Sequence, residues 1–446
     1  MGGSWRVKVG PLHGPHHVSS ILIRIINHRI MPEPAIAPHL TAAEAAALLG
    51  VSRQTLYAYV SRGLLRAQPA DDPRERRYAR EEVEQLAGRR ARGRQPREVA
   101  RATLDWGLPV LASAITLIED GRLHYRGEPA ERLAATATLE QVAALLWQCD
   151  AAAAFAPAAP ALPPDWLACA EARAAQPLSE RLPTLLALAA SDADSAIWQR
   201  DPQRVAAAAG ALLRLVLACV LGRPPSAEAL HLQCGEAWRL DAAGAELVRR
   251  ALVLCADHEL NASSFTARCV ASTGASLKAA VLAGLAALSG GRHGGATARV
   301  EAWWDELDRA GGAAADDVPA DSVPADYVGV ALHARLARGD GLPGFGHPLY
   351  PHGDPRAQLL LAQILPQRPA WRTMLEAAER LTGGLPSIDV ALVALRRHLG
   401  LPRDAAFGLF AAGRTAGWIA HALEQRGEPG LIRPRAAYVG PPPAGT

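Results

Sequence analysis

The chain has few aromatic residues, no closely spaced cysteines and no long uninterrupted apolar run. Aromatic residues are 5% of the 446 residues and alanine dominates the hydrophobic half, which favours close-packed helices over β-sheets. The six cysteines never form a Cys-x-x-Cys pair, so we expect buried, reduced thiols in a cytoplasmic protein and no metal site. No stretch of about 18 apolar residues occurs, so we predict no membrane span.

The first 38 residues lack most features of a targeting segment. Residues 1–32 carry four basic residues and no acidic one, but Arg24 interrupts the apolar stretch ILIRII and no small-residue cleavage site follows. Met31 stands just before the Pro- and Ala-rich PEPAIAPH. We predict that residues 1–38 are a disordered extension, explained by a gene start placed too far upstream.

Residues 39–90 show the pattern of a helix-turn-helix. Thr41 and Glu44 form a T-x-x-E capping box around the start of AEAAALL. Ser52 precedes a second short helix, RQTLYAYVSR, which Gly63 would end. The polar segment RAQPADDPRERRYAREEVEQL follows, which we interpret as a wing and a third helix. This stretch resembles the helix-turn-helix of MerR and excisionase-like regulators.

This resemblance implies contacts with duplex DNA. The second helix would enter a groove and the wing would contact phosphates; the side chains expected to do so are Arg53, Gln54, Tyr57, Arg74, Arg76 and Arg77. Residues 39–101 carry 13 arginines against 8 acidic residues, while the whole chain has a net charge of +3, so a basic head precedes a mildly acidic body. Residues 91–106 are expected to be a basic linker. The alternative is a helix-turn-helix that serves only packing or dimerisation.

Residues 107–446 consist almost entirely of alanine- and leucine-rich segments with helical spacing, such as RVAAAAGALLRLVLACVL and DAAFGLFAAGRTAGWIAHALEQ. One β-hairpin is predicted, ASAITLIEDGRLHYRG, in which β-branched and aromatic residues flank Asp120-Gly121. We therefore predict a mainly α protein, with a winged helix-turn-helix in front of a large helical region.

Polar clusters interrupt these helices. The most unusual is LSGGRHGGAT, because four glycines around one histidine are costly unless the backbone closely approaches a turn or a ligand. On its own, this stretch could also be an ordinary helix end. The other clusters, in chain order, are ALVLCADHELNASSF, PGFGHPLYPHGDPR, GGLPSIDVALVALRRHLG, GRTAGWIAHALEQ and LIRPRAAY.

In this order, and at this approximate spacing, the clusters resemble the citrate synthase family. The upstream stretch GRLHYRGEPAERLAATATLEQVAALLW is similar to the family's early hairpin and first helices, so the likeness covers about residues 107–440. The resemblance implies a citrate-synthase-like two-domain helical fold over residues 107–446, in which a small subdomain at about 296–403 is inserted into a large domain. The site would lie in the cleft between them, and the protein would be a homodimer.

The resemblance also implies a role for each site residue. His293 would donate a hydrogen bond to the thioester oxygen of acetyl-CoA as an enolate forms, and Asp389 would remove the methyl proton. His347 would polarise the ketone of oxaloacetate, and His258 would hold that substrate. The carboxylates of oxaloacetate would be bound by three arginines, the last of them from the neighbouring subunit: Arg356, Arg414 and Arg433.

The chemistry explains these residue types. A thioester methyl group is a weak acid, so the base that removes its proton must be shielded from water, which raises the pKa of the base. The apolar neighbours of Asp389, namely Ile388, Val390 and Ala391, suit this. A donor aimed at a developing enolate is worth about 2.7–4 kcal/mol in comparable sites. Guanidinium groups bind carboxylates in a bidentate manner. We expect no permanently bound cofactor and no metal, with acetyl-CoA as a co-substrate.

Three features differ from the usual family pattern. SIDVALVA stands where NVDFYSG is typical, GHPLYPHGD replaces the basic GHRVYK near the coenzyme, and a helix-turn-helix precedes the family region.

We consider three hypotheses for the function. The first is condensation of acetyl-CoA with oxaloacetate to citrate and CoA, the tricarboxylic acid cycle reaction. The others are 2-methylcitrate synthesis from propionyl-CoA, and a DNA-binding regulator whose citrate-synthase-like domain senses CoA thioesters or tricarboxylates.

Overall fold

The structure is a computed structural model that describes residues 39–49, 51–61, 65–69, 76–80, 82–83, 111–189, 191, 195–310, 325–436 and 438–441. The chain divides into two compact units, Met1–Val110 and Leu111–Thr446, which are described separately. The predicted extension at 1–38 and the predicted linker at 91–106 lie outside the described residues.

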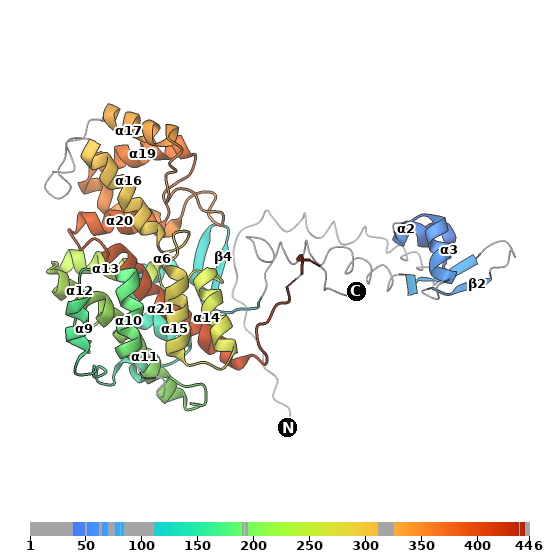
Figure 1. Cartoon of the computed structure of the whole chain (residues 1–446), viewed down its shortest axis with the longest axis horizontal. Helices are drawn as coiled ribbons and strands as arrows, with labels where there is room; N and C mark the ends of the chain where they lie inside the picture. Colours follow the sequence, from blue (N-terminus) through green and yellow to red (C-terminus); the bar gives the residue numbers. More distant parts are fainter. Residues whose placement is uncertain are drawn as a thin grey trace, which may run out of the picture. The chain divides into compact units, whose positions relative to one another are not determined.

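The first unit is a winged helix-turn-helix (Figure 1). Its antiparallel sheet has the order β1-β3-β2. Its elements are β1 (His39–Thr41), α2 (Ala42–Leu49), α3 (Arg53–Ser61), β2 (Ala67–Pro69) and β3 (Arg76–Ala79). The predicted third helix is described only at Arg80, Glu82 and Val83, which are helical. A small apolar core holds the unit together, formed by Leu40, Ala45, Ala46, Leu49, Leu56, Leu65, Tyr78 and Val83.

Both predicted helix caps of this unit are confirmed. The Thr41 N–H donates to Glu44 Oε2 at 2.8 Å, and the Glu44 N–H donates to Thr41 Oγ1 at 3.3 Å, which is the reciprocal pattern of a capping box. The Thr55 N–H donates to Ser52 Oγ at 3.2 Å at the start of α3. These local bonds fix where each helix begins and therefore which side chains α3 exposes.

The second unit begins with the predicted hairpin, formed by β4 (Thr116–Glu119) and β5 (Arg122–Tyr125), to which β6 (Glu128–Pro129) adds. Asp120 and Gly121 have φ of 50° and 71°, as a two-residue turn between strands of this twist requires. All the following elements are helical: α6 (Ala130–Thr136), α7 (Leu139–Trp147), α8 (Ala151–Phe155), α9 (Trp166–Ala172), α10 (Leu178–Ala189), α11 (Pro202–Leu221), α12 (Leu230–Trp238), α13 (Ala242–Leu254), α14 (Ala262–Ser272), α15 (Leu277–Leu288), α16 (Ala296–Ala310), α17 (Ala325–Ala337), α18 (Pro355–Ile364), the 3-10 helix η1 (Leu365–Gln367), α19 (Pro369–Thr382), α20 (Ile388–His398) and α21 (Ala405–Gly427).

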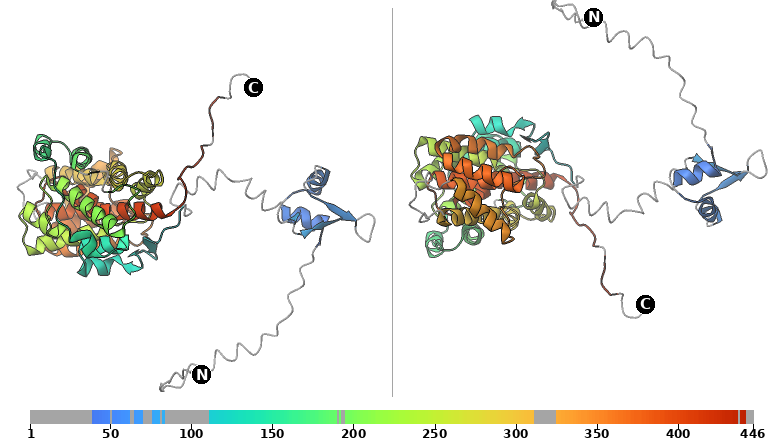
Figure 2. Two further views of the ribbon diagram at one scale, coloured as in Figure 1. Left: turned by 90° about the horizontal axis from the view of Figure 1, so that it is seen from below. Right: turned by 90° about the horizontal axis from the view of Figure 1, so that it is seen from above.

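Helix α21 is the centre of this unit. It is buried along most of its length and packs against α7, α11, α13, α14 and α15. Its label lies beside those of α14 and α15 in Figure 1, and its red ribbon runs within the unit in Figure 2. A Cβ added to Gly284 of α15 would lie 2.6 Å from the Trp418 ring, so this glycine lets the two helices approach closely. Helix α11 is long and apolar enough to cross a bilayer, but 67% of its apolar window is buried inside the protein, as in a core helix.

Helices α16, α17, α19 and α20 gather at one end of the unit, in the region predicted to be the small subdomain (Figure 1). Ion pairs join α16 to α20: Arg396 pairs with Glu301 at 2.7 Å, and Arg397 pairs with Glu301 at 3.0 Å and with Asp308 at 2.6 Å. These ion pairs fix the position of α20, which begins at Ile388 and carries Asp389 in its first turn. The subdomain boundaries at 296 and 403 stay a prediction.

Candidate active site

Two glycines let α21 lie directly on the end of α13, just before His258. A Cβ at Gly413 would lie 2.7 Å from the Leu252 carbonyl oxygen, and one at Gly417 would lie 2.6 Å from the Ala256 oxygen. The Gly417 N–H instead donates to that oxygen at 2.9 Å. Arg414 lies between the two glycines in sequence, so the close approach brings its guanidinium to the Cys255 carbonyl, two residues before Asp257.

Arg414 is a buried cation, and no acidic side chain among the described residues forms an ion pair with it. Its side chain is 1% exposed, and its Nε donates to the Cys255 carbonyl at 2.9 Å. Its Nη2 is buried and has no hydrogen-bond partner among the described residues. Burial lowers the pKa of Arg414, against the raising effect of the Asp257 charge. A buried guanidinium with an unused N–H group is suited to bind an anion such as a carboxylate.

Asp257 is the negative charge that most raises the pKa of Arg414. It is fully buried, it accepts a hydrogen bond from Thr116 Oγ1 at 2.6 Å, and its Oδ1 lies 3.4 Å from His421 Nε2. Burial alone would raise the pKa of Asp257, but His421, Arg414 and Thr116 together lower it. Asp257 therefore stays ionised and compensates part of the charge of Arg414.

Arg356 is placed differently, because it pairs with Asp354 from its own helix start. Asp354 caps α18 and accepts hydrogen bonds from Arg356 Nε at 2.9 Å and Nη2 at 2.7 Å, and both side chains are buried. Burial alone would lower the pKa of Arg356, but the Asp354 carboxylate holds it above its ordinary value. The Nε and Nη2 atoms of Arg356 are thus already bound to Asp354.

Asp354 also connects this arginine to Asp389. Its Oδ2 accepts the Ile388 N–H at 3.0 Å, at the start of α20. Ser387 caps that helix and donates from Oγ to Asp389 Oδ2 at 3.2 Å, whereas Asp389 Oδ1 is buried without a partner among the described residues. Burial raises the pKa of Asp389 to about 6, against the lowering effects of Arg356 and Ser387. This carboxylate has one oxygen available to accept a proton.

A short backbone bridge ties His347 to the turn before Asp389. The Gly346 N–H donates to the Leu385 carbonyl at 2.8 Å, and the Ser387 N–H donates to the Gly344 carbonyl at 2.7 Å. The Leu349 N–H donates to His347 Nδ1 at 3.2 Å, which leaves the ring proton on Nε2. Burial, together with the Arg356 charge, lowers the pKa of His347 to about 4, so the ring is a neutral donor near pH 7.

His258 lies beside His347, with ring centroids 5.1 Å apart. The next residue, Glu259, has a left-handed φ of 53°, which turns the chain sharply after His258. His258 Nε2 lies 2.9 Å from the Tyr350 hydroxyl. Burial first, and then the charges of Arg356 and Arg414, lower the pKa of His258 well below its ordinary value, so this ring is also neutral.

The glycines around His293 have a structural reason. Cβ atoms at Gly294 and Gly295 would each lie 2.5 Å from atoms at the end of α15, so the second glycine pair lets the loop turn back onto that helix. His293 Nε2 lies 2.8 Å from Ser263 Oγ, and its ring is edge-on to Phe410 at 6.1 Å. Burial first, and then the arginine charges, lower the pKa of His293 to about 4.

The structure brings six of the seven predicted site residues together. His258, His347 and Arg356 all contact Tyr350. Asp354 links Arg356 to the start of the helix that carries Asp389, and Phe410 contacts both His293 and Arg414. Arg433 is exposed in the segment after α21, so its predicted role in a neighbouring subunit stays a prediction. Sequence reasoning gave no role to several contacting residues, although most lie within the quoted motifs: Asp257, Ser263, Tyr350, Asp354 and Phe410.

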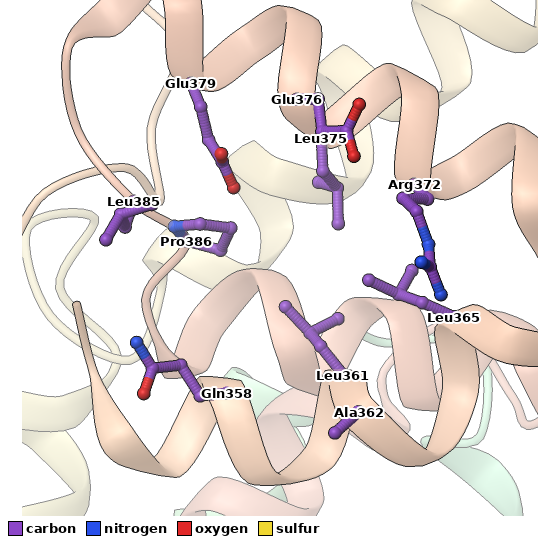
Figure 3. Close-up of a pocket in the computed structure, with 10 residues that line it drawn as sticks. All are labelled: Gln358, Leu361, Ala362, Leu365, Arg372, Leu375, Glu376, Glu379, Leu385 and Pro386. Atoms are coloured by element: carbon purple, nitrogen blue, oxygen red, sulfur yellow. The ribbon is translucent and has the colours of Figure 1, made fainter.

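A separate pocket of about 340 Å³ lies between α18 and α19 and contains none of the predicted residues. Its walls include Leu361, Leu375 and Glu379, and the turn Leu385-Pro386 closes one side (Figure 3). The turn Leu385-Pro386, which precedes Asp389 in the chain, thus forms part of the pocket wall. Among the described residues, no group of three or more His, Cys, Asp or Glu side chains is arranged to hold a metal ion.

In the first unit, helix α3 exposes the predicted DNA-contacting residues. Arg53 and Gln54 are exposed and Tyr57 is 52% exposed, while Leu56 points into the core. On the predicted wing, Arg76 is exposed and Arg77 is half-buried, and Arg74 lies outside the described residues. The unit therefore offers a polar helix face of the kind that enters a DNA groove.

Comparisons with known proteins fit both units. Residues 40–91 match the family described as "Helix-turn-helix domain", and residues 103–435 match "Citrate synthase, C-terminal domain". The first curated relatives align over about half of their own length. One of these relatives is the citrate synthase of Haloferax volcanii, 38% identical over 205 residues, which are 44% of this chain and 50% of that protein.

Longer alignments lead to the same family. A 2-methylcitrate synthase of Mycobacterium tuberculosis is 30% identical over 378 residues, covering 75% of this chain and 89% of that protein. The crystal structure of citrate synthase from Thermotoga maritima is 25% identical, with a TM-score of 0.61, and covers 75% of this chain and 94% of that one. The match at 103–435 spans most of the chain and includes every predicted site residue of the second unit. The chain therefore belongs to the citrate synthase family.

Proposed function

We propose that this protein is an acyltransferase that condenses acetyl-CoA with oxaloacetate to give citrate and CoA. One observation carries the proposal: Asp389 Oδ1 is buried without a hydrogen-bond partner among the described residues, and the pKa of this carboxyl group is raised to about 6. A domain that only sensed its ligand would gain nothing from such a group, whereas a base acting on a weak carbon acid needs it.

In the proposed reaction, Asp389 Oδ1 removes a proton from the thioester methyl group, and the electron pair moves toward the thioester oxygen. His293 would stabilise that oxygen through Nδ1–H, which requires the Ser263 hydroxyl to turn its proton from Asn261 Oδ1 to His293 Nε2. The enolate carbon then bonds to the ketone carbon of oxaloacetate. His347 would donate its Nε2 proton to the ketone oxygen as it becomes an alcohol. Water finally cleaves the citryl thioester and releases CoA.

Substrate carboxylates are proposed to bind at the arginines. The unused Nη2 of Arg414 is the strongest candidate, because it is buried and without a partner among the described residues. Arg356 would share its guanidinium between Asp354 and the substrate. Arg433 would complete the set from a neighbouring subunit, which makes the working form a homodimer. The proposed compartment is the cytoplasm.

The test is CoA release, followed with a thiol reagent, from acetyl-CoA with and without oxaloacetate. Release that depends on oxaloacetate and runs at ordinary enzymatic rates (on the order of 1–10³ per second) supports the proposal. Propionyl-CoA, run in parallel, distinguishes a 2-methylcitrate synthase, the activity named for one relative. Absence of release from a protein that oxaloacetate or CoA still protects against heat would favour the sensing regulator.

A second function is proposed for the first unit, on the exposed face of α3. We propose that Arg53, Gln54 and Tyr57 contact the bases or backbone of duplex DNA and that the wing arginines contact phosphates. The full chain, titrated against labelled duplexes at several salt concentrations, should bind more weakly as salt rises. Equal binding at low and high salt would contradict this proposal.

A further inference from the structure

Tyr350 lies among the groups proposed to bind oxaloacetate. Its side chain is buried, its ring centroid lies 4.9 Å from that of His347, and the Arg356 guanidinium carbon lies 5.6 Å from its ring. Its hydroxyl lies 2.9 Å from His258 Nε2. Tyr350 thus touches three of these groups and is the hydrogen-bond partner of one.

The direction of the bond between Tyr350 and His258 follows from the partners available. Among the described residues, the Tyr350 hydroxyl has His258 Nε2 as its one hydrogen-bond partner. If His258 donated the proton, the hydroxyl hydrogen would be buried without an acceptor, which is costly. Burial also raises the pKa of the Tyr350 phenol, so its proton stays on the oxygen. The hydroxyl therefore donates and His258 Nε2 accepts.

We infer that Tyr350 is a positioning residue that fixes His258 in the tautomer protonated at Nδ1, so that His258 presents a hydrogen-bond donor to the bound dicarboxylate. Among the described residues, the ring of His258 makes its hydrogen bond through Nε2, which leaves the Nδ1 proton available to a ligand. The opposite tautomer would place a lone pair there, which repels a carboxylate or ketone oxygen. The inference rests on the proposed function only for the identity of that ligand.

Leu349, the residue before Tyr350, acts in the same way on the ring of His347. Leu349 N–H donates to His347 Nδ1 and leaves the proton on Nε2, while Tyr350 donates to His258 Nε2 and leaves the proton on Nδ1. Two successive residues therefore set two neutral histidines as donors. This gives a role to the HPLY sequence, which departs from the usual basic pattern of the family at its second residue.

The tautomer can be measured directly by NMR on the full chain labelled with ¹⁵N-histidine, with His258→Gln used to assign the signals. We expect His258 to show a protonated Nδ1 and an unprotonated, hydrogen-bonded Nε2. In Tyr350→Phe both tautomers should be populated. A wild-type His258 protonated at Nε2 would overturn the inference, whether or not the protein turns over.

Kinetics provides the second readout. Tyr350→Phe keeps the ring against His347 and Arg356 but removes the hydroxyl, so KM for oxaloacetate should rise about tenfold while kcat falls less than about threefold. Tyr78→Phe, which removes a buried hydroxyl from the first unit, is the matched control and should leave KM unchanged. An unchanged KM in Tyr350→Phe would contradict the role of Tyr350. Wild-type protein without oxaloacetate-dependent CoA release would contradict the proposed function instead, and the tautomer measurement would still decide the inference.

Discussion

The two units present their polar side chains in opposite ways. In the first unit, Arg53, Gln54 and Tyr57 lie on the surface of a helix whose other face packs on a small core. In the second unit, Arg414 and Asp389 Oδ1 are enclosed. A surface face can bind a large polyanion such as DNA, whereas an enclosed group can act on a small molecule from which water is excluded.

The comparison shows how each site affects the stability of the unit that carries it. Exposed polar side chains remain hydrated and cost the first unit little. Buried charges need compensation, and the second unit provides it unevenly: Asp354 neutralises Arg356, while Arg414 and Asp389 each keep an atom without a partner among the described residues. Substitutions in the second unit should therefore affect both activity and stability, and those in the first unit chiefly DNA affinity.

The largest effect is expected from Asp389→Ala. Loss of the base should lower kcat by about 10²–10⁴, because proton removal from the methyl group loses its acceptor. The affinity for oxaloacetate, measured by calorimetry, should change less than about twofold, since the arginines and His258 remain. Loss of oxaloacetate binding together with turnover would show that Asp389 holds substrate and is not the base.

Replacement of the two buried arginines should have different consequences. Arg356→Leu leaves Asp354 buried and unpaired, so the free energy of unfolding should fall by about 3–5 kcal/mol. Arg414→Leu removes a cation that has no ion-pair partner in the described part of the chain, so its effect on stability should be smaller, while oxaloacetate affinity falls strongly. Chemical denaturation of both variants measures the contrast, and equal destabilisation would refute it.

The raised pKa of Asp389 predicts a stability effect that depends on pH. Because the folded-state pKa is about 6, above the ordinary value of 3.8, the folded protein binds this proton more tightly than the unfolded chain. The associated stability is present below the ordinary pKa and is lost as pH rises through about 6. Asp389→Asn should therefore be more stable than wild type at pH 8, by about 1–3 kcal/mol, but not at pH 4. Denaturation curves at both pH values test this, and a variant equally stable to wild type at pH 8 speaks against a desolvated base.

The smallest effect is expected on the exposed face of the first unit. Arg53→Ala should weaken duplex binding about tenfold and leave thermal stability and CoA release unchanged. Arg76→Ala should instead reduce the salt dependence of binding by about one phosphate contact. If either variant lowered CoA release from the full chain, the contrast between a DNA-contacting surface and a separate catalytic interior would not hold.

Much of this molecule could be predicted from the sequence, because its signals are local. The capping box at Thr41 and Glu44 and the turn at Asp120-Gly121 each depend on a few adjacent residues. The site residues were predicted from motifs whose order resembles the citrate synthase family, and the structure brings six of the seven together. The boundaries of the small subdomain and the role of Arg433 stay predictions.

What the sequence could not reveal depends on contacts between distant segments. His258 and Tyr350 lie 92 residues apart in the chain, and only the fold shows that their polar atoms meet. Arg414 donates to the Cys255 carbonyl, 159 residues away in the chain, and this contact too appears only in the fold. The glycines after His293 could be predicted to allow a close approach, but not that the approached atoms would belong to Leu288 and Ser289.

The unpartnered oxygen of Asp389 also bears on the history of this chain. A carboxylate with one buried oxygen that lacks a partner lowers the stability of every folded copy, so mutation to a neutral residue would be favoured in a lineage that no longer used it. A chain that had become a pure regulator could discard this aspartate while keeping Gly413 and Gly417, which its helix packing requires. The presence of Asp389 in a chain that also carries a helix-turn-helix is what selection for the proposed turnover would produce.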